Sequence, residues 1–572
     1  MKLMFYLFKL IIQIIIFNAV FTNVNAINFN KSNSAENISN YFSGIVSLND
    51  NNYYKSYSYF KDLKGLENKH FTYSQLYIFT LINNNKIIEA FNYVKKLEKK
   101  NIKSFEGDII KLVYYLKKNE FELAQKSLLR INENQSSSKT GLQKLLINSI
   151  EKWLKLKTIN FHQAKTIFET KEKKLNNLNK IQNVFLYCYY QNENTENMFK
   201  NLVKDDNTDF SRYYFFYLNY LSSINKKKTY EVLEEALSKN PRSLAIQQFK
   251  KDLDEENKSN YLNKFNCNNI AHIVAEIFYI TANALSTQSL YANSNFYLNL
   301  AKFLNEDFKS YETLYAENFY MTKNYKLSKN LYKKISNFSE VYHWYASKQI
   351  SSILLKEEKK NEAINFLKLS FEKLSNPSIY EIYDYAYFLK NNEKYSNSIK
   401  FYSNVLNKIN NDHDLYSKAT DGRGIAYERV GEWSKAEKDF LNSLKVNPNQ
   451  AYVLNYLAYS WLEKGIKIEE SLEMLEKAND LRKNDGYITD SLGWALFKLK
   501  KYSKANEILQ EAVRLMPSDP VINDHFGDTL WMTGRKIQAR YYWKYVLSLE
   551  KTEEDLRKKI NKKLIFGLQK KS

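Results

Sequence analysis

The chain has 572 residues and a formal charge of +22, and it contains 13 glycines and 5 prolines. Average usage would give about 40 glycines and about 29 prolines at this length. This scarcity excludes the glycine-rich phosphate cradles of Rossmann and P-loop proteins and disfavours folds built on β-turns. With 44% hydrophobic and 15% aromatic residues, the chain can form a core, so we expect a mostly helical protein rather than a disordered one.

The positive charge has two interpretations. A sequence pI near 9.3 is typical of proteins that bind nucleic acid or an anionic membrane surface. Lys, Asn, Ile, Tyr and Phe are abundant together, however, and their AT-rich codons would raise the lysine content without such a partner. The densest basic clusters, residues 226–228 and 562–571, lack the interleaved aromatic residues of a single-strand-binding groove. We expect no nucleic-acid partner and keep a helical-repeat RNA-binding protein as an alternative.

Residues 1–26 have the pattern of a secretory signal peptide. Lys2 and Lys9 supply positive charge, residues 10–21 form an apolar run, and residues 24–26 (VNA) are a small-residue cleavage site. The alternative is an N-terminal membrane anchor, since the apolar stretch approaches a spanning length. We expect an exported protein of the periplasm, with outer-membrane or peripheral membrane association open, whose mature chain begins with a linker over residues 27–36.

One spacing recurs through most of the chain. Two small residues, a bulky residue, a further small residue and a proline follow one another at intervals of 12, 4, 3 and 5 residues. This spacing resembles positions 8, 20, 24, 27 and 32 of the tetratricopeptide repeat (TPR). Small residues at 8 and 20 let two antiparallel helices approach closely, the bulky residue at 24 fills the gap to the next pair, and proline ends the second helix. These repeat-packing residues are Gly424, Ala436, Phe440 and Pro448, then Gly493, Ala505, Leu509, Ala512 and Pro517, then Gly527, Ala539 and Trp543.

The repeat predicts an all-α TPR solenoid of antiparallel helix pairs stacked into a right-handed superhelix, in two halves. An N-terminal TPR-like solenoid over residues 37–244 has repeat starts at 37, 71 and 105. Residues 245–272 fit no repeat and are polar, so we expect an irregular connector there. The C-terminal solenoid covers residues 273–552, residues 553–572 form a capping helix, and the repeat starts are 273, 309, 344, 379, 417, 451, 486 and 520.

The two cysteines form no metal-binding or CxxC pattern. Cys188 and Cys267 are 79 residues apart, which spans more than two repeats. Packed helices in a solenoid lie about 8 to 10 Å apart, so this separation exceeds the reach of about 7 Å between bridged Cα atoms. We expect two separate buried thiols.

The sequence offers no catalytic or metal-binding pattern. The six histidines are scattered, and no HExxH, GxSxG or Walker motif is present. Repeats fill nearly the whole mature chain, so no room of about 100 residues is left for a separate catalytic domain. We expect a protein that is not an enzyme and that uses no cofactor and no metal.

The first helix of each repeat lines the inner wall of such a superhelix, and positions 2, 5, 9 and 12 share one face of it. In the last three repeats this stripe combines aromatic rings with amides and carboxylates, which protein interfaces use as anchors. We therefore expect a protein-binding groove lined by Tyr452, Asn455, Tyr459, Tyr487, Asp490, Trp494, Phe497, Asp524 and Trp531. The alternative is that these rings pack against neighbouring repeats or reflect the general abundance of tyrosine and phenylalanine.

The C-terminal block also resembles a narrower group. The DSLGW element at residues 490–494 and the GIKIEES insertion at 465–471 are similar to exported TPR proteins of Gram-negative bacteria, which include outer-membrane-associated adaptors of carboxy-terminal processing proteases. The resemblance implies a non-enzymatic scaffold or adaptor of the cell envelope that presents a protease or a peptidoglycan hydrolase to protein or extended-peptide partners. Those adaptors are lipoproteins, whereas no lipid-accepting cysteine follows the apolar run here. A TPR module with a cryptic glycan-related activity is a second alternative.

Overall fold

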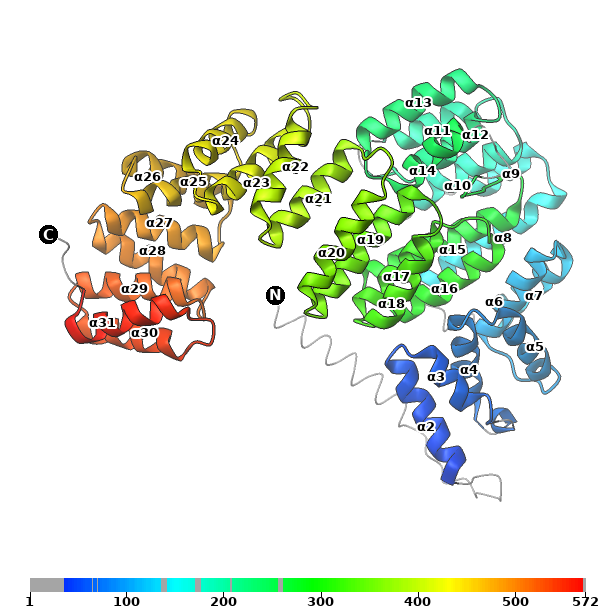
Figure 1. The fold of residues 1–572 in the computed structure, drawn as a ribbon. Helices are drawn as coiled ribbons and strands as arrows, with labels where there is room; N and C mark the ends of the chain where they lie inside the picture. The colour runs from blue at the N-terminus through cyan, green and yellow to red at the C-terminus, as the bar shows by residue number, and fades with distance from the viewer. Residues whose placement is uncertain are drawn as a thin grey trace. The chain divides into compact units, whose positions relative to one another are not determined.

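The computed structural model describes residues 35–63, 65–68, 70–134, 141–169, 176–205, 208–255 and 261–568. Within these ranges the chain is helical and has no β-strand beyond a single antiparallel bridge between Asn263 and Phe308. The predicted signal peptide lies outside the described residues, and so does the linker apart from residues 35 and 36. The chain forms two compact units that divide between Ile353 and Leu354 (Figure 1).

Unit 1 is built from successive helix pairs. Two short 3-10 turns, Leu66–Asn68 and Leu156–Thr158, interrupt them. In chain order the helices are α2 (Ala35–Asn49), α3 (Tyr53–Phe60), α4 (Phe71–Asn83), α5 (Ile87–Glu98), α6 (Phe105–Lys117), α7 (Phe121–Asn134), α8 (Gly141–Lys155), α9 (Phe161–Phe168), α10 (Asn176–Tyr189), α11 (Thr195–Val203), α12 (Tyr213–Leu221), α13 (Lys226–Lys239), α14 (Leu244–Asp254), α15 (Ile270–Thr287), α16 (Tyr291–Leu304), α17 (Tyr311–Met321), α18 (Tyr325–Ile335) and α19 (Glu340–Lys356), whose last turn belongs to unit 2.

Unit 1 is held together by helices that are far apart in the sequence. Helix α15 packs on α6 and α8, and α16 packs on α4 and α6. The ring of Phe296 stacks on Phe79 at a centroid distance of 5.5 Å, and the Tyr315 hydroxyl donates to the Asn83 carbonyl oxygen at 3.1 Å. One hydrophobic core therefore extends from α2 and α3 to α17, so the first helices of the chain and those after residue 270 fold as one body.

The connector expected at residues 245–272 is not where the structure divides. Its first part is the helix α14, which buries Ile246, Phe249 and Leu253, and its last residues open α15. Among its described residues, Phe249, Leu253 and Phe265 belong to the hydrophobic core of unit 1.

Helix α15 is long and apolar enough to cross a membrane by length and composition. Most of its residues are buried inside unit 1, against α6, α8 and α16. A helix that is hydrophobic on all sides is typical of a buried core position, and that is the position it has here.

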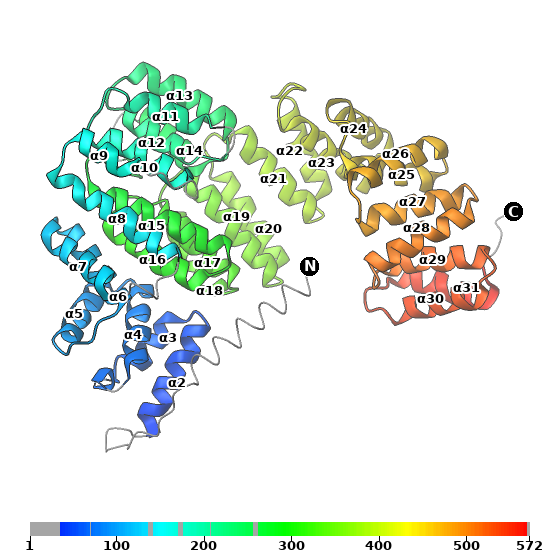
Figure 2. The same ribbon diagram turned by 180° about the vertical axis from the view of Figure 1, so that it is seen from behind.

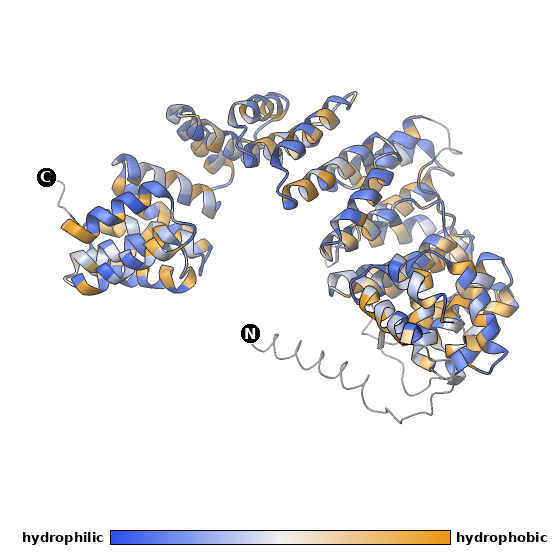
Figure 3. Cartoon of the chain, turned by 60° about the horizontal axis from the view of Figure 1, so that its bottom comes forward, coloured by the Kyte–Doolittle hydropathy of each residue, from blue (hydrophilic) through white to orange (hydrophobic). Residues whose placement is uncertain are grey.

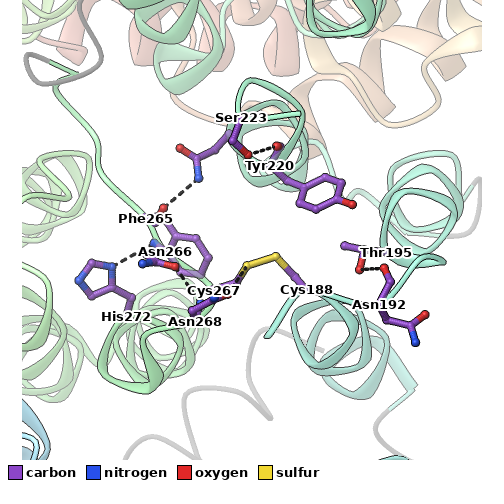
Figure 4. Close-up of a disulfide and its surroundings, with 11 residues drawn as sticks. Cys188, Asn192, Thr195, Tyr220, Ser223, Phe265, Asn266, Cys267, Asn268 and His272 are labelled. Atoms are coloured by element: carbon purple, nitrogen blue, oxygen red, sulfur yellow. Dashed lines mark hydrogen bonds between the residues drawn. A yellow bond between two sulfur atoms is a disulfide. The ribbon is translucent and has the colours of Figure 1, made fainter. Parts of the chain in front are cut away.

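The two cysteines form a disulfide (Figure 4). Cys188 lies at the end of α10 and Cys267 in the segment before α15, and their Cα atoms are 5.9 Å apart. The ring of Phe265 packs on Phe185 and Phe216, with centroid distances of 5.2 and 4.7 Å, and so holds this segment against α10 and α12. The prediction of two separate thiols is wrong because it assumed a linear stack of repeats. In unit 1, helix pairs that are far apart in the sequence lie next to each other.

Unit 2 is a single stack of helix pairs, seen from both sides in Figures 1 and 2. Its first helices begin at 379, 416, 451, 486 and 520, where the sequence predicts repeat starts at 379, 417, 451, 486 and 520. The helices are α20 (Lys360–Glu372), α21 (Ile379–Asn391), α22 (Tyr395–Leu406), α23 (Tyr416–Arg429), α24 (Trp433–Val446), α25 (Ala451–Lys464), α26 (Ile468–Leu481), α27 (Gly486–Lys498), α28 (Tyr502–Leu515), α29 (Pro520–Met532), α30 (Lys536–Ser548) and α31 (Glu554–Phe566).

Local chemistry sets the ends of these helices. The Ser378 hydroxyl and the Glu381 carboxylate form a capping box at the start of α21. Pro448 and Pro517 lie two residues beyond the ends of α24 and α28, where a missing N–H costs no helical hydrogen bond. Figure 3 shows hydrophobic and hydrophilic residues interleaved along the helices, so each helix has an apolar face to bury against its neighbours.

Candidate protein-binding groove of unit 2

The first helices of unit 2 approach one another more closely than the second helices do. Helices α21 and α23, α25 and α27, and α27 and α29 contact each other directly, whereas α23 and α25 have no contacts of similar extent. Among the described second helices, α22, α24, α26, α28 and α30, consecutive members have no contacts of similar extent. The stack therefore bends toward its first helices, and these line its inner surface.

Glycine at position 8 allows the close approach of the two helices in a repeat. A Cβ atom built on Gly424 would lie 2.8 Å from the Phe440 ring, and one on Gly493 would lie 2.5 Å from Leu509 Cγ. At Gly527 the distance to Trp543 Nε1 would be 2.6 Å. The bulky residue at position 24 thus occupies the space that a side chain at position 8 would need. Ala436, Ala505, Ala512 and Ala539 are fully buried in the same helix pairs.

Position 2 of the groove is open to solvent. The side chains of Tyr452 and Tyr487 are 53% and 56% exposed, and Val521 is also exposed. The Tyr452 hydroxyl donates to Asp485 Oδ2 at 3.0 Å, and Tyr487 hydrogen-bonds Asp519. Each ring is therefore held by the carboxylate at the start of the next repeat.

These carboxylates have a second role. Asp485 Oδ1 accepts hydrogen bonds from the Tyr487 and Ile488 amides and caps α27, and Asp519 caps α29 in the same way. The tyrosine–aspartate link was missed in the sequence, although an aspartate follows each tyrosine by 32 or 33 residues. An earlier repeat has it too, because the Tyr380 hydroxyl donates to Asp414 at 2.8 Å.

Positions 5 and 9 of the last repeats are mostly closed. The Trp494 side chain is 9% exposed. Its indole stacks on the His525 ring at a centroid distance of 3.9 Å and donates from Nε1 to Glu463 at 2.8 Å. The ring of Phe497 also stacks on Trp494, at a centroid distance of 4.8 Å. The expectation of an open groove is wrong for Trp494, and the alternative, packing between repeats, holds there.

Asp490 is buried beneath this stack and pairs with His525. Both carboxylate oxygens lie 3.0 Å from His525 Nδ1. Burial alone would lower the pKa of His525, but the carboxylates of Asp490 and, to a smaller extent, Asp524 and Asp528 more than offset it, so the pKa is raised. Asp490 therefore links two repeats and is not an open groove residue.

Asp524 is also buried, with Asp528 beside it. Lys563 of α31 contacts both carboxylates, with Nζ–O distances of 2.7 to 2.9 Å, and the Trp543 indole donates to Asp528 at 3.1 Å. Burial, and next the neighbouring Asp524 charge, raise the pKa of Asp528 to about 7. Helix α31 thus caps the stack through a lysine between two carboxylates.

The remaining expected groove residues are partly buried. Asn455 Oδ1 is enclosed and has no hydrogen-bond partner among the described residues. Burial raises the pKa of the Tyr459 hydroxyl above its usual range. Trp531 packs on Trp543 at a centroid distance of 5.4 Å. The groove thus has an exposed rim at position 2 and a more enclosed floor at positions 5, 9 and 12.

No group of three or more His, Cys, Asp or Glu residues that could hold a metal ion occurs in the described part of the chain. A hollow lies beside the disulfide of unit 1, where the sequence placed the connector. Its described lining includes amides, hydroxyls, aromatic rings, Ile224, Lys264 and the two cysteines, and none of the lining residues is acidic. The paired carboxylates of a glycan-cleaving site are therefore not found at that hollow.

The helix pairs, their spacing and the contacts between positions 8 and 24 define a TPR solenoid. Proteins of this class present extended inner surfaces and generally mediate protein–protein interaction. No protein-family model matches the chain.

The sequence is similar over short stretches to two TPR repeat-containing proteins. It is 28% identical over 106 residues to one of Pseudomonas aeruginosa, a match that covers 18% of each chain. It is 26% identical over 171 residues to one of Methanocaldococcus jannaschii, covering 29% of this chain and 28% of that protein. The chain therefore matches less than a third of the length of either relative.

Solved TPR structures are similar to part of the chain. MamA from Desulfovibrio magneticus gives a TM-score of 0.28 at 18% identity and covers 32% of this chain and 99% of its own. YrrB, a TPR protein with an unusual peptide-binding site, gives a TM-score of 0.27 at 15% identity and covers 32% of this chain and 92% of its own.

Proposed function

We propose that this protein is a non-enzymatic scaffold whose unit 2 groove binds an extended segment of a partner protein. The observation that carries the proposal is the row of exposed side chains at position 2, in which Tyr452 and Tyr487 are fixed by aspartates of the next repeat. An exposed ring that is already held in place loses little conformational entropy when a partner covers it. Rigid aromatic anchors of this kind dominate the energetics of many protein interfaces.

We also propose that the protein acts in the bacterial cell envelope. The signal-like pattern of residues 1–26 supports export. The Cys188–Cys267 disulfide supports it independently, because such bonds persist in oxidising compartments such as the periplasm. The similarity of the DSLGW and GIKIEES elements to exported adaptors supports a finer proposal, the presentation of a protease or a peptidoglycan hydrolase to its partners.

Quantitative co-purification tests the binding groove. The tagged full chain is expressed in the organism that naturally produces it. The amounts of recovered partners are then compared between the wild type and the double variant Tyr452→Ala/Tyr487→Ala. We expect the groove partners to fall by at least about tenfold, as for the loss of hot-spot residues. The variant Tyr452→Phe/Tyr487→Phe keeps the rings and should retain more binding than the alanine variant.

A matched control uses Tyr541, which is 69% exposed on the second helix α30. Tyr541→Ala removes an exposed ring outside the groove and should leave partner recovery unchanged. Equal recovery by the wild type and by both double variants would refute the groove. Amino-terminal sequencing of the mature protein tests export, with a start at residue 27 expected and an intact residue 1 contradicting cleavage.

A further inference from the structure

Helix α31 of unit 2 changes character along its length. Its first turn carries Glu554 and Asp555, its middle carries lysines, and its end carries Ile565 and Phe566. The side chains of Ile565 and Phe566 are 69% and 66% exposed, and Figure 3 shows this hydrophobic end of the helix beside the C label. Large apolar side chains that meet at a protein surface, rather than standing singly, are typical of an interaction site.

The lysines and the apolar pair share one face of α31. Five exposed residues have the spacing i, i+1, i+4, i+7 and i+8, namely Lys558, Lys559, Lys562, Ile565 and Phe566. At 3.6 residues per turn these positions lie within about a third of the helix circumference. The opposite face of α31 belongs to a hydrophobic cluster with residues of α29 and α30. The basic and apolar side chains are therefore presented together, away from the stack.

The start of α30 extends this surface. Lys536 and Arg540 lie over the Trp531 ring, 5.3 and 5.1 Å from its centroid. The backbone of Gly567 reaches the same ring, because a Cβ atom on Gly567 would overlap the indole. Trp531 thus brings the end of α31 and the start of α30 together. The side chain of Ile537, next to Lys536, is 88% exposed and adds apolar area there.

The charge of this surface is positive. Helix α30 contains no Asp or Glu, and both carboxylates of α29 are buried in ion pairs with Lys563. Lys558 lies 3.8 Å from Asp555 at the other end of α31. Four cations form no ion pair with a described residue, namely Lys536, Arg540, Lys559 and Lys562. Uncompensated positive charge therefore lies beside exposed apolar side chains.

We propose that these four cations, together with Ile565 and Phe566, form a basic–apolar patch that binds the surface of a lipid bilayer with anionic headgroups. The lysines and the arginine are attracted by the negative surface potential of such a bilayer. Ile565 and Phe566 enter the boundary between the headgroups and the acyl chains, as the apolar residues of an interfacial helix do. The patch belongs to α30 and α31, so the inference goes beyond the proposed groove and does not depend on it.

The chemistry of the patch favours a bilayer over two other partners. A second copy docked by two-fold symmetry would place the patch against itself, and so like charge against like charge. A single-stranded nucleic acid uses several aromatic rings on which successive bases stack. Of the six patch residues, Phe566 has a ring, and aliphatic Ile565 stands beside it. An aliphatic and an aromatic side chain next to lysines suit a headgroup layer better than a row of bases.

Photo-crosslinking from lipid to protein tests the patch. Vesicles are made of phosphatidylcholine alone or of phosphatidylcholine mixed with phosphatidylglycerol, and both contain a trace of phosphatidylcholine with a diazirine in its acyl chain. The full chain is mixed with each, illuminated and digested, and mass spectrometry measures the label on peptides from α30 and α31. We expect at least about tenfold more label with the anionic vesicles at low salt, and a loss of this difference at high salt because the charges are screened. This readout is local, so lipid contacts elsewhere in the chain do not affect it.

Two double variants separate charge from apolar contact. Lys559→Gln/Lys562→Gln removes two cations, and Ile565→Ser/Phe566→Ser removes the apolar pair; all four side chains are exposed, so neither change removes a core contact. Each should reduce the label on α30, whose residues neither variant alters, by about tenfold. The matched control Lys477→Gln/Lys483→Gln removes two exposed lysines elsewhere in unit 2 and should leave the label unchanged.

Equal labelling of α30 and α31 by the neutral and the anionic vesicles would overturn the patch, and so would unchanged labelling in both double variants. Single-stranded RNA is added in a further arm at the same concentration of negative charge as the anionic lipid. Retention of the lipid label supports the bilayer, whereas its loss to RNA would show that the patch prefers nucleic acid and would overturn the proposal. Tyr452→Ala/Tyr487→Ala should not change the lipid label, so the patch and the groove stand or fall separately.

Discussion

Replacing Lys563 by methionine tests how the end of the solenoid is closed. Methionine keeps the length and apolar stem of the side chain but leaves Asp524 and Asp528 without the cation that lies 2.7 to 2.9 Å from their oxygens. Both carboxylates are buried and close enough for Asp524 to raise the pKa of Asp528. Removing one partner from a buried ion pair typically costs about 3 to 5 kcal/mol. We expect about 3 kcal/mol at pH 8.

The cost should depend on pH. The pKa of Asp528 is raised from 3.8 to about 7, so the folded state binds more protons than the unfolded state between these values, and stability falls as the pH rises through 7. The raised pKa of His525 acts in the same direction, since its contribution is present below about 6.5 and is lost above its folded pKa. At pH 5.5 Asp528 is already protonated, so Lys563→Met should cost only about half as much.

Hydrogen exchange measured by mass spectrometry gives a local readout, which a repeat protein requires because its unfolding need not be two-state. Peptides from α29 and α31 should open about a hundredfold more often in Lys563→Met at pH 8, as about 3 kcal/mol implies. Lys559→Met is the control, because Lys559 is exposed on the same helix and makes no ion pair with a described residue. Exchange within about threefold of the wild type at pH 8, or a larger effect at pH 5.5, would refute the reasoning.

Two further predictions concern packing and the disulfide. Gly527→Ala places a Cβ atom 2.6 Å from Trp543 Nε1, and this overpacking should cost about 1 to 3 kcal/mol of folding free energy. The cost is measured as a lower Tm of unit 2. The control is Gly141→Ala, which should not lower the Tm because nothing lies within 4 Å of a Cβ atom there. Cys267→Ser opens a loop of 79 residues and should cost about 4 kcal/mol in chemical denaturation of the oxidised protein. If reduction of the wild type leaves its stability unchanged, a disulfide between Cys188 and Cys267 does not stabilise the protein.

The repeat frame of unit 2 could be predicted from the sequence because its determinants are local. A glycine at position 8 and a bulky residue at position 24, such as Gly493 and Leu509, must meet within one helix pair whatever surrounds it. Their spacing fixes where the pair begins, and so the predicted starts agree with the helices. Fold class followed from the same short-range contacts.

The packing of unit 1 could not be predicted in this way because it depends on contacts between distant helices. Nothing in the sequence near Asn83 states that Tyr315 will donate to its carbonyl, 232 residues further along the chain. The disulfide was missed for the same reason, since Cys188 and Cys267 meet only when the segment around Phe265 folds back on α10. The all-round apolar character of α15 was the signal available, because such a helix must be covered on every side.

The exposure of the residues expected to line the groove was predicted in part. Position 2 is open in each of the last repeats, but position 9 depends on what the next helix places against it. Trp494 is covered because the following first helix has His525 at the matching place, and Asp490 lies against that ring and contributes to the rise in its pKa. The sequence shows which residues share one face of a helix. Whether each of them is buried depends also on the side chains of the next helix, which that pattern does not include.

The exposed tyrosines show how one side chain can serve both the stack and a partner. The hydroxyl of Tyr452 is bound to the aspartate that caps the next helix. The Arg482 guanidinium lies over the ring, 4.5 Å from its centroid, and 53% of the residue is left to solvent. The hydroxyl oxygen stabilises the stack of repeats, and the ring would contact a partner. The phenylalanine variant removes only the oxygen and the alanine variant removes both, so the two variants separate stability from binding. If Tyr452→Phe loosens the repeats and keeps the partner, whereas Tyr452→Ala loses both, the ring is an anchor. If both variants lose only stability, the tyrosine row belongs to the fold alone.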